Sequence, residues 1–93
     1  MNKYIRFADI LQDKNIEEKS NAVSKIIEDF IDIYEIDFES SMPKLFEILK
    51  ATFDKVDLND IESIKMFAFC YNIVRNLAIK ADIPTEEIIN KIK

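Results

Sequence analysis

Apolar residues recur along most of the chain at the spacing of one face of an α-helix. In the first segment, Tyr4, Phe7 and Leu11 follow one another at intervals of three or four residues. Similar stripes, separated by short polar stretches, predict helices over residues 3–12, 16–37, 42–55, 60–81 and 85–92. Residues 3–7 leave an alternative open, because the stretch YIRF also suits a short edge strand.

Residues that cap helices mark where these segments begin. Asn15 and Asn59 each stand three residues before a glutamate, the capping-box pattern in which two side chains satisfy free backbone N–H groups. Ser41 is a possible cap that stands two residues before Pro43. A proline has no backbone N–H, and in the first turn of a helix that N–H would have no partner within the helix. Thr85 is followed by two glutamates, which suit the positive end of the helix dipole. These signals predict the starts of the last four helices.

The amphipathic stripes are buried together most simply in a bundle. The chain has 93 residues, enough for one modest core, and it contains no glycine, which a β-rich fold would need in its turns. We therefore expect an all-α fold. More closely, we expect a compact single-domain helical bundle of four to five helices with short loops, over residues 1–93.

The composition narrows the possible chemistry. The chain is 48% hydrophobic and 33% charged, which is typical of a folded, soluble protein. It has no histidine and one cysteine, which argues against a catalytic triad, a structural zinc site and an internal disulfide. We expect no catalysis, no cofactor and no metal. The start of the chain does not read as a signal peptide and no stretch is long enough to span a membrane, so we expect a cytoplasmic protein.

The negative charge of the chain is concentrated in one segment. The net charge is −5, which disfavours direct binding to nucleic acid. The clustered acids are Glu28, Asp29, Asp32, Glu35, Asp37 and Glu39. Without these six residues the net charge would be −5 + 6 = +1, so the acidity is local.

A helical wheel for residues 16–38 separates this acidity from an apolar stripe. Glu28, Asp32 and Glu35 fall on one side. The apolar residues gather on the other side: Ala22, Val23, Ile26, Ile27, Phe30, Ile33 and Tyr34. Two interpretations of the acidic face stay open. It is either a solvated surface, or a docking surface for a partner protein with a basic surface, since like charges at i,i+4 weaken a helix without such a use.

Two pairs of acids share a spacing found in a family of enzymes. Asp32-x-x-Glu35 and, after a loop, Asp57-x-x-Asp60 resemble the paired acidic motifs of all-α nucleotide pyrophosphohydrolases. The resemblance implies that the pairs lie on facing helices and hold Mg²⁺ against the phosphates of a nucleotide. A Mg-dependent pyrophosphohydrolase is therefore the alternative function.

The segment 61–81 contains MFAFCY, six apolar or aromatic residues in a row. Its apolar residues form a wide arc, as in a central bundle helix with several neighbours: Ile64, Met66, Phe67, Cys70, Tyr71, Ile73, Val74, Leu77, Ala78 and Ala81. We expect Cys70 to be a buried, unreactive thiol inside this arc.

Phe69 lies on the opposite, polar face of the same helix, among Lys65, Asn72 and Asn76, and we expect Lys65 and Asn72 to be solvated. One interpretation is that the N-terminal segment or the C-terminal helix Ile88–Ile92 covers Phe69. The other is that Phe69 is an exposed aromatic anchor with a polar rim, which binds a partner protein or a second copy of the chain.

Taken together, the sequence favours a small acidic cytosolic protein-binding module without chemistry of its own. In size and charge layout it is similar to bacteriocin immunity proteins and to phage-encoded inhibitors of host enzymes or defence systems. Its many Ile, Lys, Asn and Phe residues, which have AT-rich codons, suggest a low-GC bacterium or its phage. We expect an inhibitor, immunity or anti-defence type protein that docks through the acidic helix face. A homo-oligomeric interaction module, such as a homodimer, is a further alternative.

Overall fold

The protein is an all-α bundle, as predicted. The computed structural model describes residues 3–57 and 59–92, with side chains from residue 7 to residue 90 except residue 58. The helices are α1 Lys3–Leu11, α2 Lys14–Tyr34, the short 3-10 helix η1 Glu39–Ser41, α3 Met42–Lys55, α4 Ile61–Lys80 and α5 Glu86–Ile92. The described residues contain no strand, so the edge-strand alternative for residues 3–7 is wrong. The side chain of Tyr4, part of the first stripe, lies outside the described ones.

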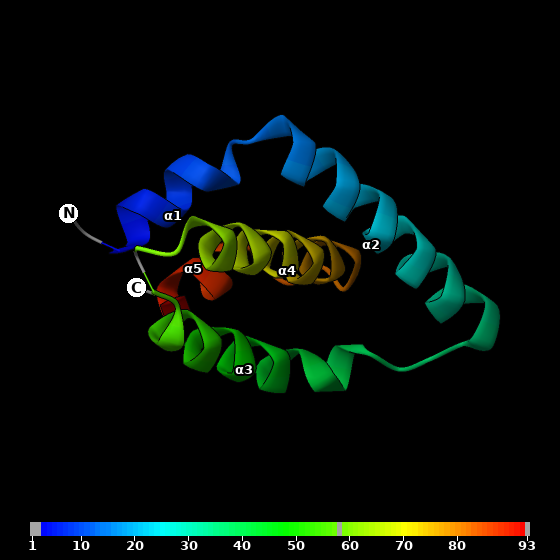
Figure 1. Ribbon diagram of the computed structural model, residues 1–93. Coiled ribbons are helices and arrows are strands. Elements are labelled where there is room, and N and C mark those ends of the chain that lie inside the picture. The colour runs from blue at the N-terminus through cyan, green and yellow to red at the C-terminus, as the bar shows by residue number, and fades with distance from the viewer. Residues whose placement is uncertain (1–2, 58, 93) are drawn as a thin grey trace.

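α4 runs through the centre of the molecule (Figure 1). α2 packs along one side of α4 and runs in the same direction, whereas α3 packs along the other side and runs in the opposite direction. α1 packs on α4 as well, and α5 packs on α3. The molecule measures 42 × 25 × 18 Å along its principal axes. α2 and α3 therefore flank α4 and leave one of its faces between them.

The aromatic core lies where α1, α3 and α4 meet. The ring of Phe7 contacts the rings of Phe53, Phe67 and Tyr71 edge-on, with centroids 5.6, 5.1 and 5.0 Å away. Phe7 is 2% exposed, so the apolar stripe predicted for the first helix does face the core. Each edge-to-face pair contributes about 0.5–1.5 kcal/mol beyond the burial of apolar area. Phe7 thus contacts both α4 and α3, and Ile10 and Leu11 of the same helix pack against the core beside it.

A polar seam (Ser20, Asn21, Ser24, Asn72 and Asn76) joins α2 to α4. The amide of Asn72 donates hydrogen bonds to Ser20 Oγ at 2.6 Å and to Asn21 Oδ1 at 2.9 Å. The amide of Asn76 donates to Asn21 Oδ1 at 2.9 Å and to Ser24 Oγ at 3.0 Å. Asn72 is only 1% exposed. The expectation that Asn72 is solvated is therefore wrong, because α2 covers this face of α4.

The core face predicted for α4 is confirmed over most of its length. Its buried apolar residues are Ile64, Phe67, Ala68, Tyr71, Leu77 and Ala78. Phe69, Ile73 and Val74 are half-buried against the same core, whereas Met66 and Cys70 of the predicted arc are exposed. None of the described helices, α4 included, is long and apolar enough to cross a membrane.

Two aspartates cap α2 and α4 in place of the predicted asparagines. Asp13 Oδ1 accepts the backbone N–H of Asn15 at 2.9 Å, so Asn15 lies inside the first turn of α2. Asp60 Oδ1 accepts two backbone N–H groups of the first turn of α4, at 3.2 and 3.3 Å, so Asn59 is not the cap either. A carboxylate adds an attraction to the positive end of the helix dipole that an amide lacks. Thr85 directly precedes α5, as predicted.

α2 ends at Tyr34, three residues before the predicted end. Glu35 adopts the left-handed conformation with φ 51°, and its N–H donates to the carbonyl of Ile31. After this turn, η1 leads directly into α3. Ser41 precedes α3, but its side chain makes no capping hydrogen bond, whereas Pro43 lies in the first turn as predicted. The short α2 places the last of the clustered acids outside any α-helix.

Candidate functional site

The six clustered acids do not form a single helix face. Three lie on the last turns of α2: Glu28, Asp29 and Asp32. The other three follow the end of α2, along its connection to α3: Glu35, Asp37 and Glu39. The prediction that the acidic face of this helix reaches Glu35 and Asp37 is therefore wrong, because the left-handed turn at Glu35 ends the helix early.

Two acids of α2 form ion pairs with lysines. Asp29 Oδ1 lies 2.9 Å from Lys25 Nζ, one turn earlier on the same helix. The hydrogen bond from Lys25 to this carboxylate raises the pKa of the lysine. Asp32 Oδ1 lies 2.9 Å from Lys80 Nζ at the end of α4. Both pairs are at the surface, where such pairs contribute little to stability, but they offset the charge of two of the six clustered acids.

Phe69 is half-buried and packs against the core. Asn72 and Asn76, which follow it by about one and two turns, bond to α2, so α2 covers the part of this face that follows Phe69, and α1 also packs on α4. α5 packs on α3 instead. Lys65 is half-buried, and its Nζ lies 4.0 Å from Glu62 Oε1. Phe69 is thus not an exposed anchor with a solvated rim, because the parallel packing of α2 on α4 takes up that surface.

Four large apolar side chains of α2 are exposed to solvent, and we call them the α2 ridge. Their exposed fractions are 69% for Ile26, 55% for Phe30, 72% for Ile33 and 64% for Tyr34. The rings of Phe30 and Tyr34 contact each other, with centroids 4.6 Å apart. We expected this stripe to face the core, and for these four residues that expectation is wrong. The helix turns its serines toward α4 instead, and the ridge lies about a third of a turn away from them.

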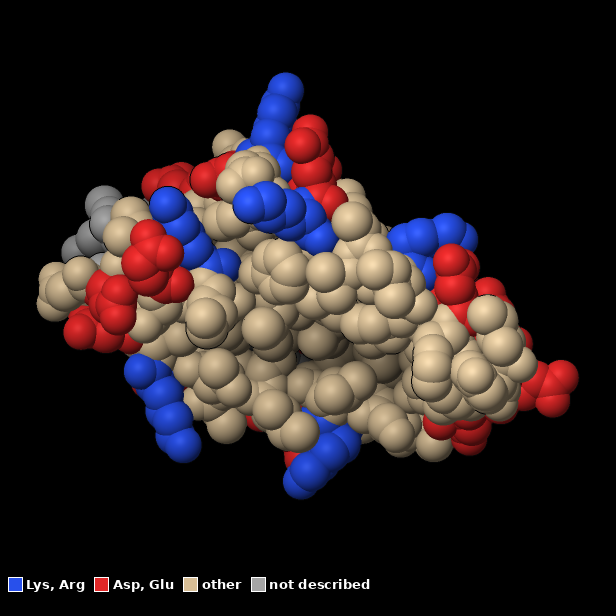
Figure 2. Space-filling model, turned by 45° about the vertical axis from the view of Figure 1, so that its right-hand side comes forward, with Lys and Arg blue, Asp and Glu red and all other residues tan. Residues whose placement is uncertain are grey.

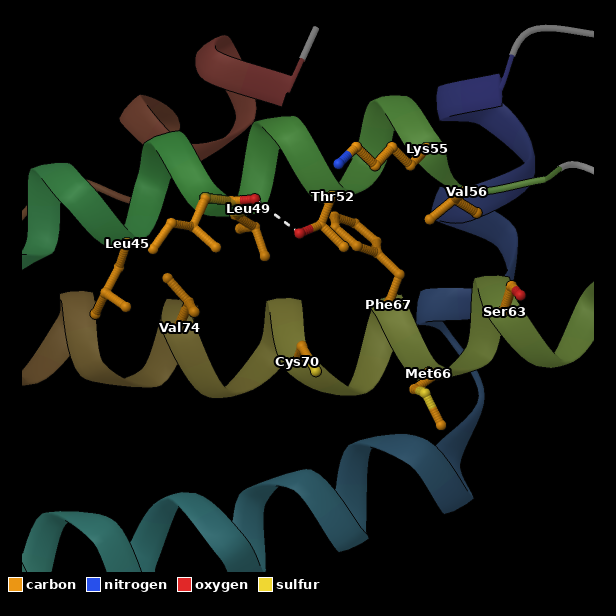
Figure 3. A pocket seen from close by; sticks show the side chains of 11 residues that line it. Leu45, Leu49, Thr52, Lys55, Val56, Ser63, Met66, Phe67, Cys70 and Val74 are labelled. Atoms are coloured by element: carbon orange, nitrogen blue, oxygen red, sulfur yellow. Dashed lines mark hydrogen bonds between the residues drawn. The ribbon is translucent and has the colours of Figure 1, made fainter.

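A pocket of about 440 Å³ lies between α3 and α4 (Figure 3). Its apolar lining consists of Leu45, Ile48, Leu49, Val56, Met66, Phe67 and Val74. Figure 3 shows Phe67 and Val74 pointing toward α3, whereas Met66 points away from it. Met66 is 72% exposed. Cys70, which also lines the pocket, is exposed, so the expected buried thiol is wrong.

The α2 ridge and the pocket open on the same side of the molecule. Seen along α4 from its start, Met66 and Cys70 lie about a third of a turn clockwise from the polar seam. Seen along α2 in the same way, Ile26 and Phe30 lie about a third of a turn counterclockwise from the seam. Because the two helices run in the same direction and face each other across the seam, these opposite rotations lead to one side.

Together, the α2 ridge and the pocket form one surface, which we call the apolar face. Figure 2 shows this side of the molecule. Uncharged side chains fill its middle, which is hollowed, and charged side chains stand mainly at its edges. The surface therefore has an apolar centre with a charged rim, the anatomy of a protein interface.

Sequence reasoning missed the α2 ridge as a surface, although a signal was present. Ser20 and Ser24 are spaced i,i+4 on α2 and are both buried. Small side chains let two helices approach closely, so a serine stripe can mark the contact face even beside a more apolar stripe. Assigning α2 by this stripe would have left the α2 ridge without a neighbour.

The acidic pairs that resemble a magnesium site lie at opposite ends of the molecule. Asp32 and Glu35 are at the end of α2, whereas Asp57 and Asp60 are in the connection between α3 and α4 (Figure 1). Asp57 Oδ1 accepts the backbone N–H of Asn59 at 2.9 Å, and Asp60 caps α4. Over the described parts of the chain, no group of three or more Asp, Glu, Cys or His residues is placed to hold a metal ion. The two pairs do not face each other as the resemblance implied.

Comparisons with known proteins do not place the chain in a family. A scan against protein-family models found no match, and searches among curated proteins and among solved structures found none. The function is therefore argued from the apolar face and its surroundings.

Proposed function

We propose that this protein binds an amphipathic helix of a partner protein in the apolar face. One observation carries the proposal: exposed apolar side chains from three helices meet around one hollow. They include Phe30 of α2, Ile48 of α3 and Met66 of α4, each at least half exposed. Contiguous apolar patches with a polar rim mark interaction sites on small soluble proteins.

The lining of the pocket favours protein side chains over a polar small molecule. Small-molecule sites fix their ligands with several convergent polar groups. Here Thr52 Oγ1 already donates to the carbonyl of Ile48 at 2.8 Å. The other polar residues of the lining, Lys55 and Ser63, lie toward one end of it (Figure 3). A ligand in the middle of the pocket would find almost only apolar contacts.

The shape of the surface favours a helix. The pocket follows α4 from Ser63 to Val74, which at 1.5 Å per residue is a length of about 16 Å, or three helical turns. α3 and α4 form the two sides of the hollow, and the α2 ridge lies beyond α4 on the same side of the molecule. An amphipathic helix laid into such a groove buries its apolar stripe, a common mode of peptide recognition. It would also complete a four-helix arrangement with α2, α3 and α4.

This docking mode agrees with the role of an inhibitor, immunity or anti-defence type protein, which acts by occupying a surface of another protein. We keep that role, in the cytoplasm of a low-GC bacterium or its phage, as part of the proposal. The contact surface is different from the one expected: the apolar face replaces the acidic helix face, and the acids stand at its edge. No catalytic step is needed.

A designed peptide tests the proposal. It has about five helical turns, a leucine stripe at i, i+3, i+4 and i+7, and glutamine on its polar face. Titrating it with the protein should raise its fluorescence anisotropy and protect the Cys70 thiol from a maleimide. Ile48→Glu and Met66→Glu place a charge in the apolar face, and each should weaken binding about tenfold or more, which corresponds to 1.4 kcal/mol.

Ile79→Glu is the matched control. Ile79 is 60% exposed but does not line the pocket, so this variant should bind the peptide as the unchanged protein does. Equal losses in all three variants, or no binding by the unchanged protein, would contradict the proposal.

A further inference from the structure

We infer that two copies of this protein pair through the α2 ridge, in an antiparallel contact between their α2 helices. The inference goes beyond the proposed function, because the partner helix proposed there lies in the groove, the pocket between α3 and α4. It assigns the ridge to one occupant, a second copy of the chain related to the first by a two-fold axis.

A helix bound in the groove leaves the α2 ridge uncovered. The groove follows α4 from Ser63 to Val74. The ridge lies further along the molecule, because Ser24 accepts a hydrogen bond from Asn76 and the ridge residues follow Ser24 on α2. At 1.5 Å per residue, the middle of the ridge lies about 15–20 Å beyond the middle of the groove. The ridge therefore needs a contact of its own.

The apolar residues of the ridge have the spacing of a coiled-coil interface. Four residues follow one another at intervals of three, four and three, the alternation of a and d positions over two heptads: Val23, Ile26, Phe30 and Ile33. Val23 is half-buried beside the ridge, and the other three are more than half exposed. Side chains with this spacing interlock with those of a second helix of the same pattern, so the ridge is complementary to a second copy of itself.

The area of the ridge is that of a weak dimer. Its four residues are 55–72% exposed, and large apolar side chains have a surface of roughly 200 Å² each. A two-fold contact covers the ridge on both copies, which gives a buried area of about 1,000 Å². That area is at the lower limit of specific interfaces, where contacts form and dissociate readily. We therefore expect a dissociation constant on the order of 10–100 µM and a monomer in more dilute solution.

The charges along α2 favour the antiparallel direction. Acids cluster at the end of the helix, whereas the exposed Lys19 lies two turns before Ile26 on the same side of it. A parallel pair would bring the two acidic ends together, and like charges that face each other across an interface are unfavourable. An antiparallel pair, with Ile26 against Phe30 of the second copy, separates these ends and places Lys19 near one of them. The two helix dipoles also oppose each other in this arrangement.

Sedimentation equilibrium tests the pairing. The unchanged protein should shift from monomer to dimer between concentrations tenfold below and tenfold above the expected dissociation constant. Ile26→Glu and Ile33→Glu place charges in the contact, and each should raise the dissociation constant about tenfold or more. Ile79→Glu is the matched control, because Ile79 is 60% exposed on α4 outside the ridge, and it should dimerise as the unchanged protein does. A monomer at every concentration, or equal losses in all three variants, would overturn the inference and leave the ridge to a different protein.

Engineered disulfides test the direction. Combined with Cys70→Ser, Ile26→Cys and Phe30→Cys each supply the single thiol of the chain. Copper phenanthroline in air oxidises two neighbouring thiols to a disulfide. In the antiparallel pair, a mixture of the two variants should form the mixed disulfide faster than either variant forms its own. Faster cross-linking of Ile26→Cys with itself would indicate a parallel pair and overturn the direction that we infer.

The outcomes separate this inference from the proposed function. Ile26→Glu should bind the leucine-stripe peptide as the unchanged protein does, and Ile48→Glu should still dimerise although its binding of the peptide is weakened. If the protein is monomeric at every concentration but binds the peptide, the pairing is wrong and the helix-binding groove stands. If it dimerises through the ridge but binds no peptide, the proposed function fails and the pairing stands.

Discussion

The Asn72 amide donates a hydrogen bond to the hydroxyl of Ser20 at 2.6 Å, and both side chains are buried between α2 and α4. Ser20 Oγ in turn donates to the carbonyl of Ile16 at 2.6 Å, and Asn72 Oδ1 accepts from Arg75 at 2.8 Å. The two residues are 52 positions apart in the chain and fix the rotation of α2 about its own axis. That rotation is what exposes the α2 ridge.

Asn72→Ala should lower the free energy of unfolding by about 1–3 kcal/mol, the cost of leaving buried polar groups without partners. The substitution removes the acceptor of Arg75 and the donor to Ser20. Urea denaturation followed by circular dichroism measures the effect. Asn15→Ala is the control, since Asn15 is exposed, and it should change the free energy by no more than about 0.5 kcal/mol. Equal effects of the two substitutions would show that the polar seam does not hold α2.

The sequence predicted the five α-helices, though not η1, because their periodicity is a local property. It also identified most of the side chains that α4 buries. It did not predict the rotation of α2, because a stripe of Ile and Phe indicates only that one face is apolar. Which face meets a neighbour depends on groups elsewhere in the chain, here Asn72 and Asn76. Those two amides donate hydrogen bonds to the serine hydroxyls of α2, and for this reason the less apolar face of α2 is the buried one.

The candidate site could not be predicted for the same reason. The apolar face is formed by residues of three helices, and none of them is unusual within its own segment. Met66 belongs to an apolar arc whose other members, except Cys70, are buried or half-buried, and the separation of α2 from α3 leaves it exposed. The acids were visible in the sequence, but their position at one end of a groove was not.

The same substitution at two phenylalanines should give opposite results. Phe7 is 2% exposed at the centre of the aromatic core, so Phe7→Ala should lower the free energy of unfolding by about 3–5 kcal/mol. Phe30 is 55% exposed on the α2 ridge, so Phe30→Ala should stay within about 0.5 kcal/mol of the unchanged protein. Denaturant titration measures both. A large loss of stability for Phe30→Ala would mean that the ridge is packed, and the apolar face would lose one of its sides.

The cap of α4 should make stability depend on pH. The Asp60 carboxylate accepts hydrogen bonds from the Ser63 hydroxyl and the Ser63 backbone N–H. Both lower its pKa in the folded protein, and the hydroxyl has the larger effect. A carboxyl whose folded pKa lies below its unfolded pKa stabilises the fold above the unfolded pKa. It loses this contribution as the pH falls through the folded pKa. The melting temperature of Asp60→Ala should therefore lie below that of the unchanged protein at neutral pH, and the gap should narrow under acid conditions.

Asn59→Ala serves as the control for this experiment, because Asn59 was the cap expected from the sequence. Its melting temperature should follow that of the unchanged protein at every pH. A gap for Asp60→Ala that stays constant from neutral to acid pH would mean that the charge of the cap contributes nothing.

The thiol of Cys70 should react in the folded protein. It is exposed in the apolar face, so a disulfide reagent reaches it without any unfolding, and the rate should not change with urea below the unfolding transition. The matched control is Cys70→Ser combined with Ala78→Cys, which moves the single thiol to a position that is 0% exposed. That thiol should react only through opening of the structure, at a rate that rises steeply with urea. If Cys70 itself showed this urea dependence, α2 and α3 would have to close over α4, and the groove proposed for the partner helix would not exist in solution.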